Sequence, residues 1–284
     1  GVVNQNDIIL INSTLKDIPE KYREFALKLE GSEGCAKERN IANNICKMNL
    51  QNGNLNVDAL MQAEDSEVII CTSAEGGTGS GASSILAQYF SDVLGKTVHM
   101  FVFGGFETDV RGLKNTVEWF KETSPNYIVE AVCNSKFLPE CNGNNLKDEI
   151  VESETNSDDT DLLKLTNTPG FMAIEHVEIG KPKNVEEFNK AVSLIIDNSK
   201  SYDVEPTGQR LGVILNINDK IADSIDYQFN VIRKKFCEQP IEVFTHIQHI
   251  DAMPNSISII VSGLKMPIEE IQEIYTSYKN RIEA

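Results

Sequence analysis

The sequence lacks an apolar run approaching the ~20 residues that a helix needs to cross a bilayer, and we expect no signal peptide. It has six cysteines but no Cys-x-x-Cys pair. That scatter argues against a zinc site and predicts reduced thiols. We therefore expect a cytoplasmic protein with no metal ligated by its own side chains and no membrane partner.

Basic residues are scarce, with 26 Lys and Arg against 43 Asp and Glu and a formal net charge of −17. A surface this acidic repels phosphate backbones and anionic lipid, so direct binding of nucleic acid is not expected. It suits a basic partner, or a site that recruits Mg²⁺ to neutralise phosphates. The length of 284 residues predicts one large or two modest domains.

Short apolar runs alternate with helical patterns in the first half of the chain. The runs are rich in β-branched or aromatic residues and are too short for buried helices, so they predict buried parallel strands at 8–11, 68–71, 98–103 and 127–133. Helical stripes follow at 85–94, ended by Gly95, and at 113–120. Strand alternating with helix predicts an α/β fold with a doubly wound parallel sheet.

The second half has a different rhythm and predicts a smaller α+β domain. Strands are expected at 171–179, 211–217, 240–250 and 256–264, the last two as a pair joined by 251–255. Helices are expected at 188–196 and 225–236, and a closing helix at 267–283 begins with Pro267 near its first turn.

A glycine-rich segment, GGTGSG, separates the second predicted strand from its helix. Glycines there remove side-chain obstruction, and backbone N–H groups at a helix N-terminus form a cradle for a phosphate chain. The segment matches neither G-x-x-x-x-G-K-[ST] nor G-x-G-x-x-G. A glycine turn for close strand–helix packing is the alternative; we favour nucleotide binding. The candidate phosphate-binding residues are Gly76, Gly77, Thr78, Gly79, Ser80 and Gly81.

This segment resembles the signature loop of the tubulin/FtsZ superfamily, and other motifs accompany it. The chain has an I-N-S-T segment at 11–14, a G-C-A-K-E-R segment at 34–39 that is similar to the TubZ branch, a loop at 104–107 and an Asn after the fourth strand. The resemblance implies that these segments contact a guanine nucleotide. The residues concerned are Asn12, Gly34, Cys35, Ala36, Lys37, Glu107 and Asn134.

An acidic stretch at 141–161 would otherwise be interpreted as a solvated linker. Its last part, N-S-D-D-T-D, resembles the N-x-D-x-x-D synergy loop of the same superfamily. The resemblance implies that Asn156, Asp158 and Asp161 act in catalysis. The two carboxylates would approach the γ-phosphate of GTP bound to the neighbouring subunit.

Two parts of the superfamily pattern have no counterpart in the printed sequence. One is a first strand with its glycine loop, and the other is a long helix between the domains, for which only residues 135–155 are available. The chain opens on Gly1 rather than Met. We therefore expect that segments of the protein are missing from this sequence.

The resemblance implies a filament-forming GTPase that binds GTP or GDP with Mg²⁺ and hydrolyses GTP at head-to-tail subunit interfaces. Residues 1–150 would form the GTPase domain, 151–266 the synergy loop and activation domain, and 267–284 the C-terminal helix. The protein would segregate plasmid or phage DNA in a bacterial cytosol through a TubR-like adaptor. Alternatives are an FtsZ-like division-ring protein, a phage spindle tubulin, and a non-polymerising nucleotide-binding enzyme such as a dehydrogenase.

Residues of four further types could suggest a functional site, and each also has a plainer structural interpretation. His246 and His249 fall on opposite faces of a predicted strand, which is poor for chelation. Trp119 is expected to pack within its helix. Lys37 and Arg39 are interpreted as a solvated helix start, with Lys37 also a candidate for phosphate proximity.

Overall fold

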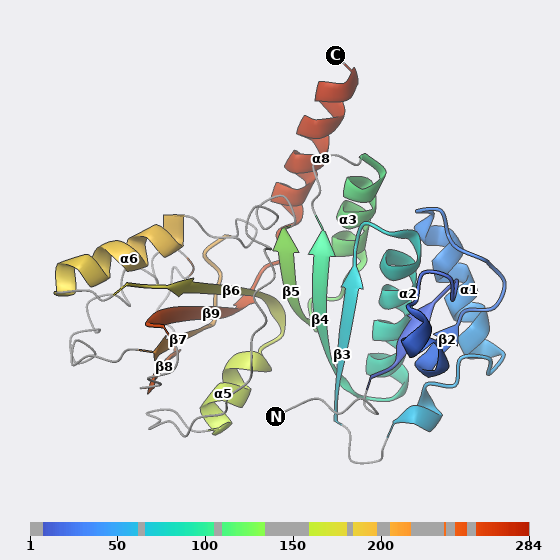
Figure 1. Ribbon diagram of the computed structural model, residues 1–284, viewed down its shortest axis with the longest axis horizontal. Helices are drawn as coiled ribbons and strands as arrows, with labels where there is room; N and C mark the ends of the chain where they lie inside the picture. Colours follow the sequence, from blue (N-terminus) through green and yellow to red (C-terminus); the bar gives the residue numbers. More distant parts are fainter. Residues whose placement is uncertain are drawn as a thin grey trace. The chain divides into compact units, whose positions relative to one another are not determined.

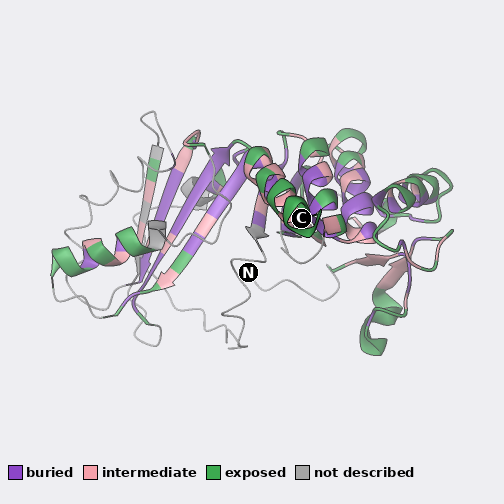
Figure 2. Cartoon of the chain, turned by 90° about the horizontal axis from the view of Figure 1, so that it is seen from above, coloured by how far each residue is buried: buried purple, intermediate pink, exposed green. Residues whose placement is uncertain are grey.

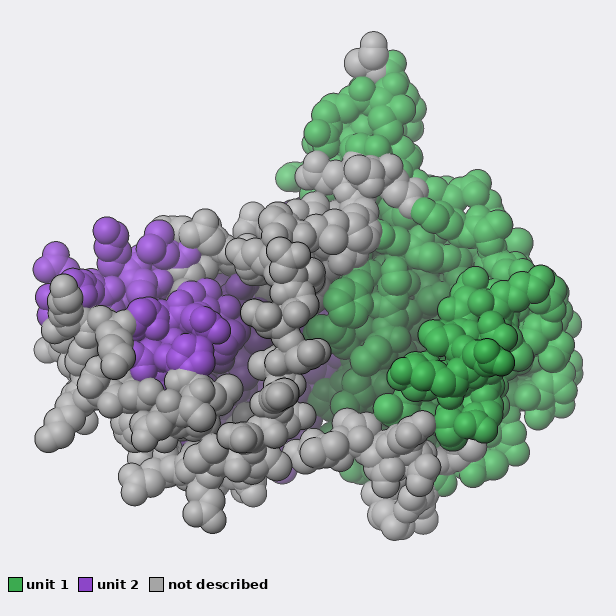
Figure 3. Space-filling view, viewed as in Figure 1, with its two compact units in different colours: residues 1–123, 271–284 green, residues 124–270 purple. Residues whose placement is uncertain are grey.

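The computed structural model describes residues 8–61, 66–104, 110–133, 159–180, 184–197, 205–216, 236, 242–248 and 254–283. The chain divides into two compact units, which Figure 3 colours separately: residues 1–123 with 271–284, and residues 124–270. The functional boundary predicted at residue 150 lies outside the described residues. That boundary stays a prediction.

The first unit contains two pairs of parallel strands. Strand β1 (Leu10–Asn12) pairs with β2 (Ala26–Lys28), and β3 (Glu67–Ser73) pairs with β4 (Thr97–Gly104). The predictions of strands at 8–11, 68–71 and 98–103 are confirmed in type, but the prediction that the first is buried was wrong, because β1 is half-buried throughout. Strand β2 was not predicted, because three half-buried residues leave no periodic signal.

Strand β3 is less buried than its apolar sequence predicts. Its residues alternate between exposed and half-buried, and Ile69 is 68% exposed, whereas alternate residues of β4 are buried. The prediction of a buried strand at 68–71 was therefore wrong in burial, though right in type. The reason is that β3 is the outermost strand of its sheet, so its apolar run is not matched by neighbours on both sides.

The first unit contains the helices α1 (Arg39–Gln51), α2 (Gly77–Gln88), which continues as a π-helix (Tyr89–Val93), and α3 (Val110–Glu122). Helix α2 packs on β3 and on α1, and α3 packs on α2 and β4. In Figure 1, α2 lies between β3 and α1. Gly95, with φ of 65°, ends the α2 segment as predicted. Short 3₁₀ helices occur at Glu20–Phe25 and Asp58–Leu60.

Helix α3 is amphipathic, and its apolar stripe is buried as the sequence predicts. The buried members include Leu113, Val117 and Phe120. The Trp119 ring is fully buried, and its Nε1 donates to Ser83 Oγ at 3.0 Å, which confirms a packing role. The final helix, α8 (Ile268–Glu283), is joined to α3 by a hydrogen bond from Lys121 Nζ to Gln272 Oε1 at 2.8 Å.

The second unit is built on a sheet with strand order β5-β6-β9-β7-β8. The strands are β5 (Ile128–Cys133), β6 (Gly170–Glu178), β7 (Arg210–Asn216), β8 (Glu242–Gln248) and β9 (Ser256–Leu264). Strand β9 runs antiparallel to both neighbours, whereas β5 pairs with β6 and β7 with β8 in parallel. Strands β6 and β9 are buried along most of their length (Figure 2).

The core of this unit includes Ile128, Leu165, Met172 and Ile260. The helices described here are α5 (Asp159–Thr166) and α6 (Val185–Asp197), the second of which was predicted. The helix predicted at 225–236 lies outside the described residues apart from Phe236.

The last two strands were predicted as an adjacent pair, and that prediction was wrong. Strand β7 lies between β8 and β9 and pairs with both. The connection from 249 to 255 is long enough to step over one strand, a distance of roughly 10 Å. Sequence adjacency therefore did not translate into pairing.

Candidate functional site

The candidate site lies in the first unit, where β3 leads into α2. The strand ends at Ser73, and the helix begins at Gly77 with Gly76 as its N-cap, which has φ −74° and ψ 168°. No side chain caps the helix. The N–H groups of residues 76–79 precede the first helical hydrogen bond, so they have no acceptor within α2. They carry the positive end of the helix dipole, which favours an anion.

The glycines of the GGTGSG segment serve two different purposes. A Cβ added at Gly76 would meet nothing within 4 Å, so space is open beside this residue. A Cβ at Gly79 would lie 2.7 Å from Thr72 Oγ1 and 2.8 Å from the carbonyl oxygen of Ser73. Gly79 is therefore required for α2 to approach β3, as the alternative interpretation held.

Gly77 and Gly81 face the other neighbour of α2. A Cβ at Gly77 would lie 2.8 Å from Cys35 Cβ, and one at Gly81 would lie 2.1 Å from the carbonyl oxygen of Arg39. These glycines let the segment that opens α1 lie directly against α2. Three glycines thus contribute close packing, and the segment combines both interpretations weighed from its sequence.

Two hydroxyl groups meet at the start of α2. Ser13 Oγ and Thr78 Oγ1 lie 2.6 Å apart, and Ser13 is fully buried. The backbone N–H of Ser13 donates to Asn12 Oδ1 at 2.8 Å. The end of β1 is thereby brought to the glycine segment, so Asn12 and Thr78, both predicted to contact nucleotide, lie in one neighbourhood.

The segment before α1 contains a tight turn with unusual residues. Ala36 and Lys37 have φ of 46° and 61°, and the N–H of Glu38 donates to the carbonyl oxygen of Cys35 at 2.6 Å. Two successive positive φ values, enclosed by a hydrogen bond from the fourth residue to the first, define a type I′ turn. The two central positions of such a turn are normally Asn and Gly. Neither Ala36 nor Lys37 is of that type, so the turn is strained, and such strain concentrates at functional sites.

Lys37→Gly is expected to make the protein more stable than Lys37→Ala by about 1 kcal/mol, because glycine accepts positive φ without strain. Both variants remove the charged side chain, so their difference isolates the backbone. Thermal or denaturant unfolding measures it. Equal stabilities of the two variants would contradict the strained turn.

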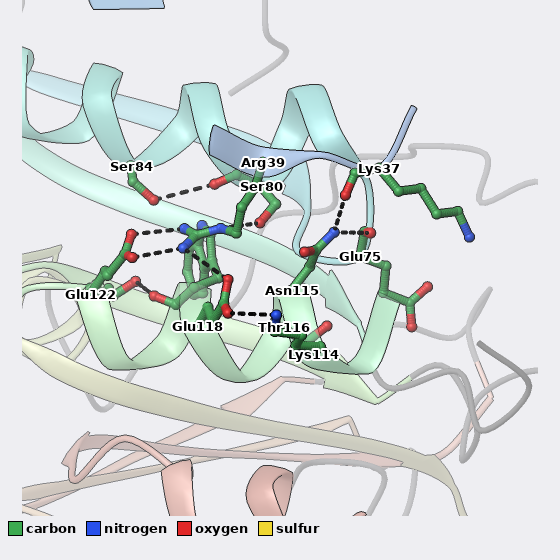
Figure 4. A network of polar contacts seen from close by, with 12 residues as sticks. Lys37, Arg39, Glu75, Ser80, Ser84, Lys114, Asn115, Thr116, Glu118 and Glu122 are labelled. Atoms are coloured by element: carbon green, nitrogen blue, oxygen red, sulfur yellow. Dashed lines mark hydrogen bonds and ion pairs between the residues drawn. The ribbon is translucent and has the colours of Figure 1, made fainter. Parts of the chain in front are cut away.

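Arg39 is the first residue of α1 and is 4% exposed. Its Nε donates to Ser80 Oγ at 3.1 Å, and its two terminal nitrogens donate to Glu122 Oε1 and Oε2 at 2.7 and 2.8 Å (Figure 4). The paired bonds to a carboxylate are the strong geometry for a guanidinium. The interpretation of Arg39 as a solvated helix start was therefore wrong, because the residue ties α1 to α2 and α3.

The structure brings together most of the residues predicted to hold phosphate. Residues 12, 34–37 and 76–81 converge where α1 and α2 begin, although the Ser80 hydroxyl is buried and held by Arg39. Glu107, Asn134, Asn156 and Asp158 lie outside the described residues. Asp161 falls in the first turn of α5, where its backbone alone is described.

Sequence reasoning missed Asn115, which lies on α3. Its Nδ2 donates to the carbonyl oxygens of Lys37 and Glu75 at 2.9 and 3.0 Å, and the residue is 5% exposed (Figure 4). Asn115 lies on the side of the helix opposite the predicted stripe of Leu113, Val117 and Phe120, so the sequence carried no signal that this amide would be buried and would need partners.

Comparison with known proteins identifies the fold. No known protein-family profile matches the chain, and no curated protein does. Solved structures do match over nearly the whole chain. The GTPγS-form protofilament of Bacillus thuringiensis serovar israelensis TubZ is 14% identical, with a TM-score of 0.73, covering 97% of this chain and 85% of that one.

Two further structures agree. CetZ2 from Haloferax volcanii, a GTPγS-bound protofilament, is 12% identical with a TM-score of 0.69, covering 97% of this chain and 90% of that chain. TubZ of Clostridium botulinum phage c-st is 13% identical with a TM-score of 0.67, covering 96% and 90%. The protein is an α/β protein in which a glycine-rich loop leads from strand β3 to the N-terminus of helix α2. Its fold is the tubulin/FtsZ fold, as the motifs predicted.

Among the described residues, no helix is both long and apolar enough to span a membrane.

Proposed function

We propose that this protein is a filament-forming GTPase that hydrolyses GTP where one copy meets the next. The observation that carries the proposal is the uncapped N-terminus of α2, whose N–H groups at 76–79 adjoin open space at Gly76. Among the proteins that share its fold, TubZ of Bacillus thuringiensis and CetZ2 were solved as GTPγS protofilaments, and CetZ1 from Haloferax volcanii as a GDP-bound monomer.

The described residues fit a nucleoside triphosphate. A phosphate chain would accept hydrogen bonds from the open N–H groups of α2, with the Thr78 hydroxyl as a further donor. Lys37, in the strained turn beside Gly77, is exposed and would supply positive charge at the terminal phosphates. Glu107 and Asn134 would contact ribose and base. The described residues include no cluster of three or more His, Cys, Asp or Glu suited to a metal. Mg²⁺ would be held mainly by the nucleotide, whose charge it neutralises.

Hydrolysis would need groups that the phosphate-holding loops do not supply. A carboxylate that orients and polarises water is the missing part, and Asp158 and Asp161, assisted by Asn156, would supply it from the next copy. Such head-to-tail contact does not close on itself, so it builds a filament. Loss of the γ-phosphate beneath that contact would weaken it.

DNA segregation through a TubR-like basic adaptor is the role we propose for the filament in a bacterial cytosol. The net charge of −17 supports an adaptor, since the chain itself would repel DNA. An FtsZ-like division-ring protein or a phage spindle tubulin would have the same GTPase activity. Each would differ from this proposal in what the filament acts on.

The proposal is tested by phosphate release and light scattering over a range of protein concentrations. Turnover per molecule is expected to rise steeply above a threshold concentration at which scattering also rises, because the site is completed by stacking. A non-polymerising α/β enzyme such as a dehydrogenase would instead bind NAD and show turnover per molecule independent of concentration.

A further inference from the structure

Asn115 connects the two loops that converge at the candidate site. It lies on α3, and Asn115 Nδ2 donates to the carbonyl oxygens of Lys37 and Glu75 at 2.9 and 3.0 Å. A side-chain amide nitrogen carries two hydrogens, so both donors are used. At 5% exposure, water cannot readily replace either bond.

The bond to Glu75 sets the direction of the next N–H. A trans peptide places its C=O and N–H on opposite sides of one plane, and the described chain has no cis peptide. Because the Glu75 oxygen is turned toward Asn115, the Gly76 N–H is turned away from Asn115. Gly76 adjoins the space in which a Cβ would meet nothing within 4 Å. Asn115 therefore fixes the direction of the Gly76 N–H, the first backbone donor of α2 that has no acceptor within the helix.

The bond to Lys37 acts on the strained turn in the same way. With the Lys37 oxygen held by Asn115, the N–H of the same peptide, from Glu38, donates to Cys35 at 2.6 Å and closes the turn. Arg111, one helical turn earlier on α3, donates to the carbonyl oxygen of Ala36 at 3.2 Å. The carbonyls of both positive-φ residues are thus held by α3.

We propose that Asn115 is a positioning residue that presets both phosphate-holding loops together. It fixes the Gly76 N–H toward the nucleotide and holds Lys37 in its strained turn. This inference rests on the proposed GTP site, because it assigns the geometry of that site to a residue that touches no nucleotide. Loss of Asn115 would loosen both loops at once, since its one nitrogen bonds a carbonyl oxygen of each.

The test compares Asn115→Leu and Asn115→Asp with Thr116→Val. Asp has nearly the size of asparagine and Leu has its branched shape, and both remove the donors. The control removes a fully buried hydroxyl that bonds Gly112 within α3, at 2.9 Å. Affinity for GTP with Mg²⁺ is expected to fall about tenfold or more in both Asn115 variants, and by less than about twofold in the control. Hydrogen exchange should rise together at residues 34–38 and 74–79 in the Asn115 variants only.

The pH dependence of GTP affinity distinguishes the proposed role of Asn115 from general destabilisation. The carboxyl group introduced by Asn115→Asp can donate to one carbonyl once it is protonated. The GTP affinity of Asn115→Asp should therefore recover toward that of the unaltered protein as pH falls, whereas Asn115→Leu should not recover. In the unaltered protein, the Asn115 side-chain amide protons should exchange slowly, which needs no variant.

Unchanged GTP affinity and unchanged exchange in Asn115→Leu would overturn the proposal. Fast exchange of the Asn115 amide protons in the unaltered protein would overturn it as well. If the unaltered protein binds no GTP, the proposed function fails, and the exchange measurements still decide whether Asn115 holds both loops.

Discussion

Asp161→Ala is expected to reduce GTP turnover about 100-fold or more while leaving GTP binding intact, because a positioned carboxylate contributes that much to proton transfer. The loops proposed to hold the phosphates in each copy are untouched by this change. Filaments should form and persist, since the γ-phosphate that stabilises the contact would stay in place. Phosphate release, GTP binding and light scattering measure the three effects separately.

The control for this variant is Asp159→Ala. Asp159 is the first residue of α5 and lies two positions away, but it stands outside the N-x-D-x-x-D pattern. Both variants remove one negative charge from the same helical turn. Turnover that falls equally in both variants, or in neither, would contradict the assignment of Asp161 as the catalytic carboxylate.

Gly81→Ala is expected to destabilise the fold by about 3 kcal/mol, because the added carbon would overlap neighbouring atoms of α1. It would lie 2.1 Å from the Arg39 carbonyl oxygen and 2.8 Å from Ala42 Cβ, so α1 and α2 would have to separate. That separation also pulls Arg39 away from Ser80. Chemical denaturation measures the loss.

Gly76→Ala is the matched comparison, for which we expect a small loss of stability but weaker GTP binding. Its φ of −74° suits alanine and its surroundings are open, so the stability cost should stay below about 1 kcal/mol. The added methyl group would occupy the space next to the open N–H groups, so GTP binding should weaken. If Gly76→Ala proves as destabilising as Gly81→Ala, the division of the glycines into packing and binding positions is wrong.

The sequence predicted the order of elements well where a local signal existed. Apolar runs and helical stripes located β3, β4, β6, β7, α3 and α6, because side-chain periodicity follows from burial of one face. It failed where structure depends on distant partners. The exposure of Ile69 reflects the outermost position of β3, and the insertion of β7 between β8 and β9 is a choice of neighbour that no local pattern encodes.

The candidate site likewise combines a part that a local sequence signal predicts with a part that depends on distant residues. The glycine segment predicts a cradle, because glycines at a strand–helix junction leave the backbone N–H groups unobstructed, and three of these glycines also allow close packing. What supports the cradle could not be predicted, since Arg39, Asn115 and Glu122 are dispersed along the chain and meet only after folding. A charged residue that opens a helix usually faces solvent, and only tertiary packing shows that Arg39 is buried.

The central claim is that each copy holds GTP but needs a second copy to hydrolyse it. It is tested most directly by single-turnover hydrolysis of bound GTP, measured on protein held far below the concentration at which light scattering rises, and again far above it. The account predicts bound but almost unhydrolysed GTP in the dilute sample and rapid hydrolysis in the concentrated one. Equal single-turnover rates in the two samples would contradict it.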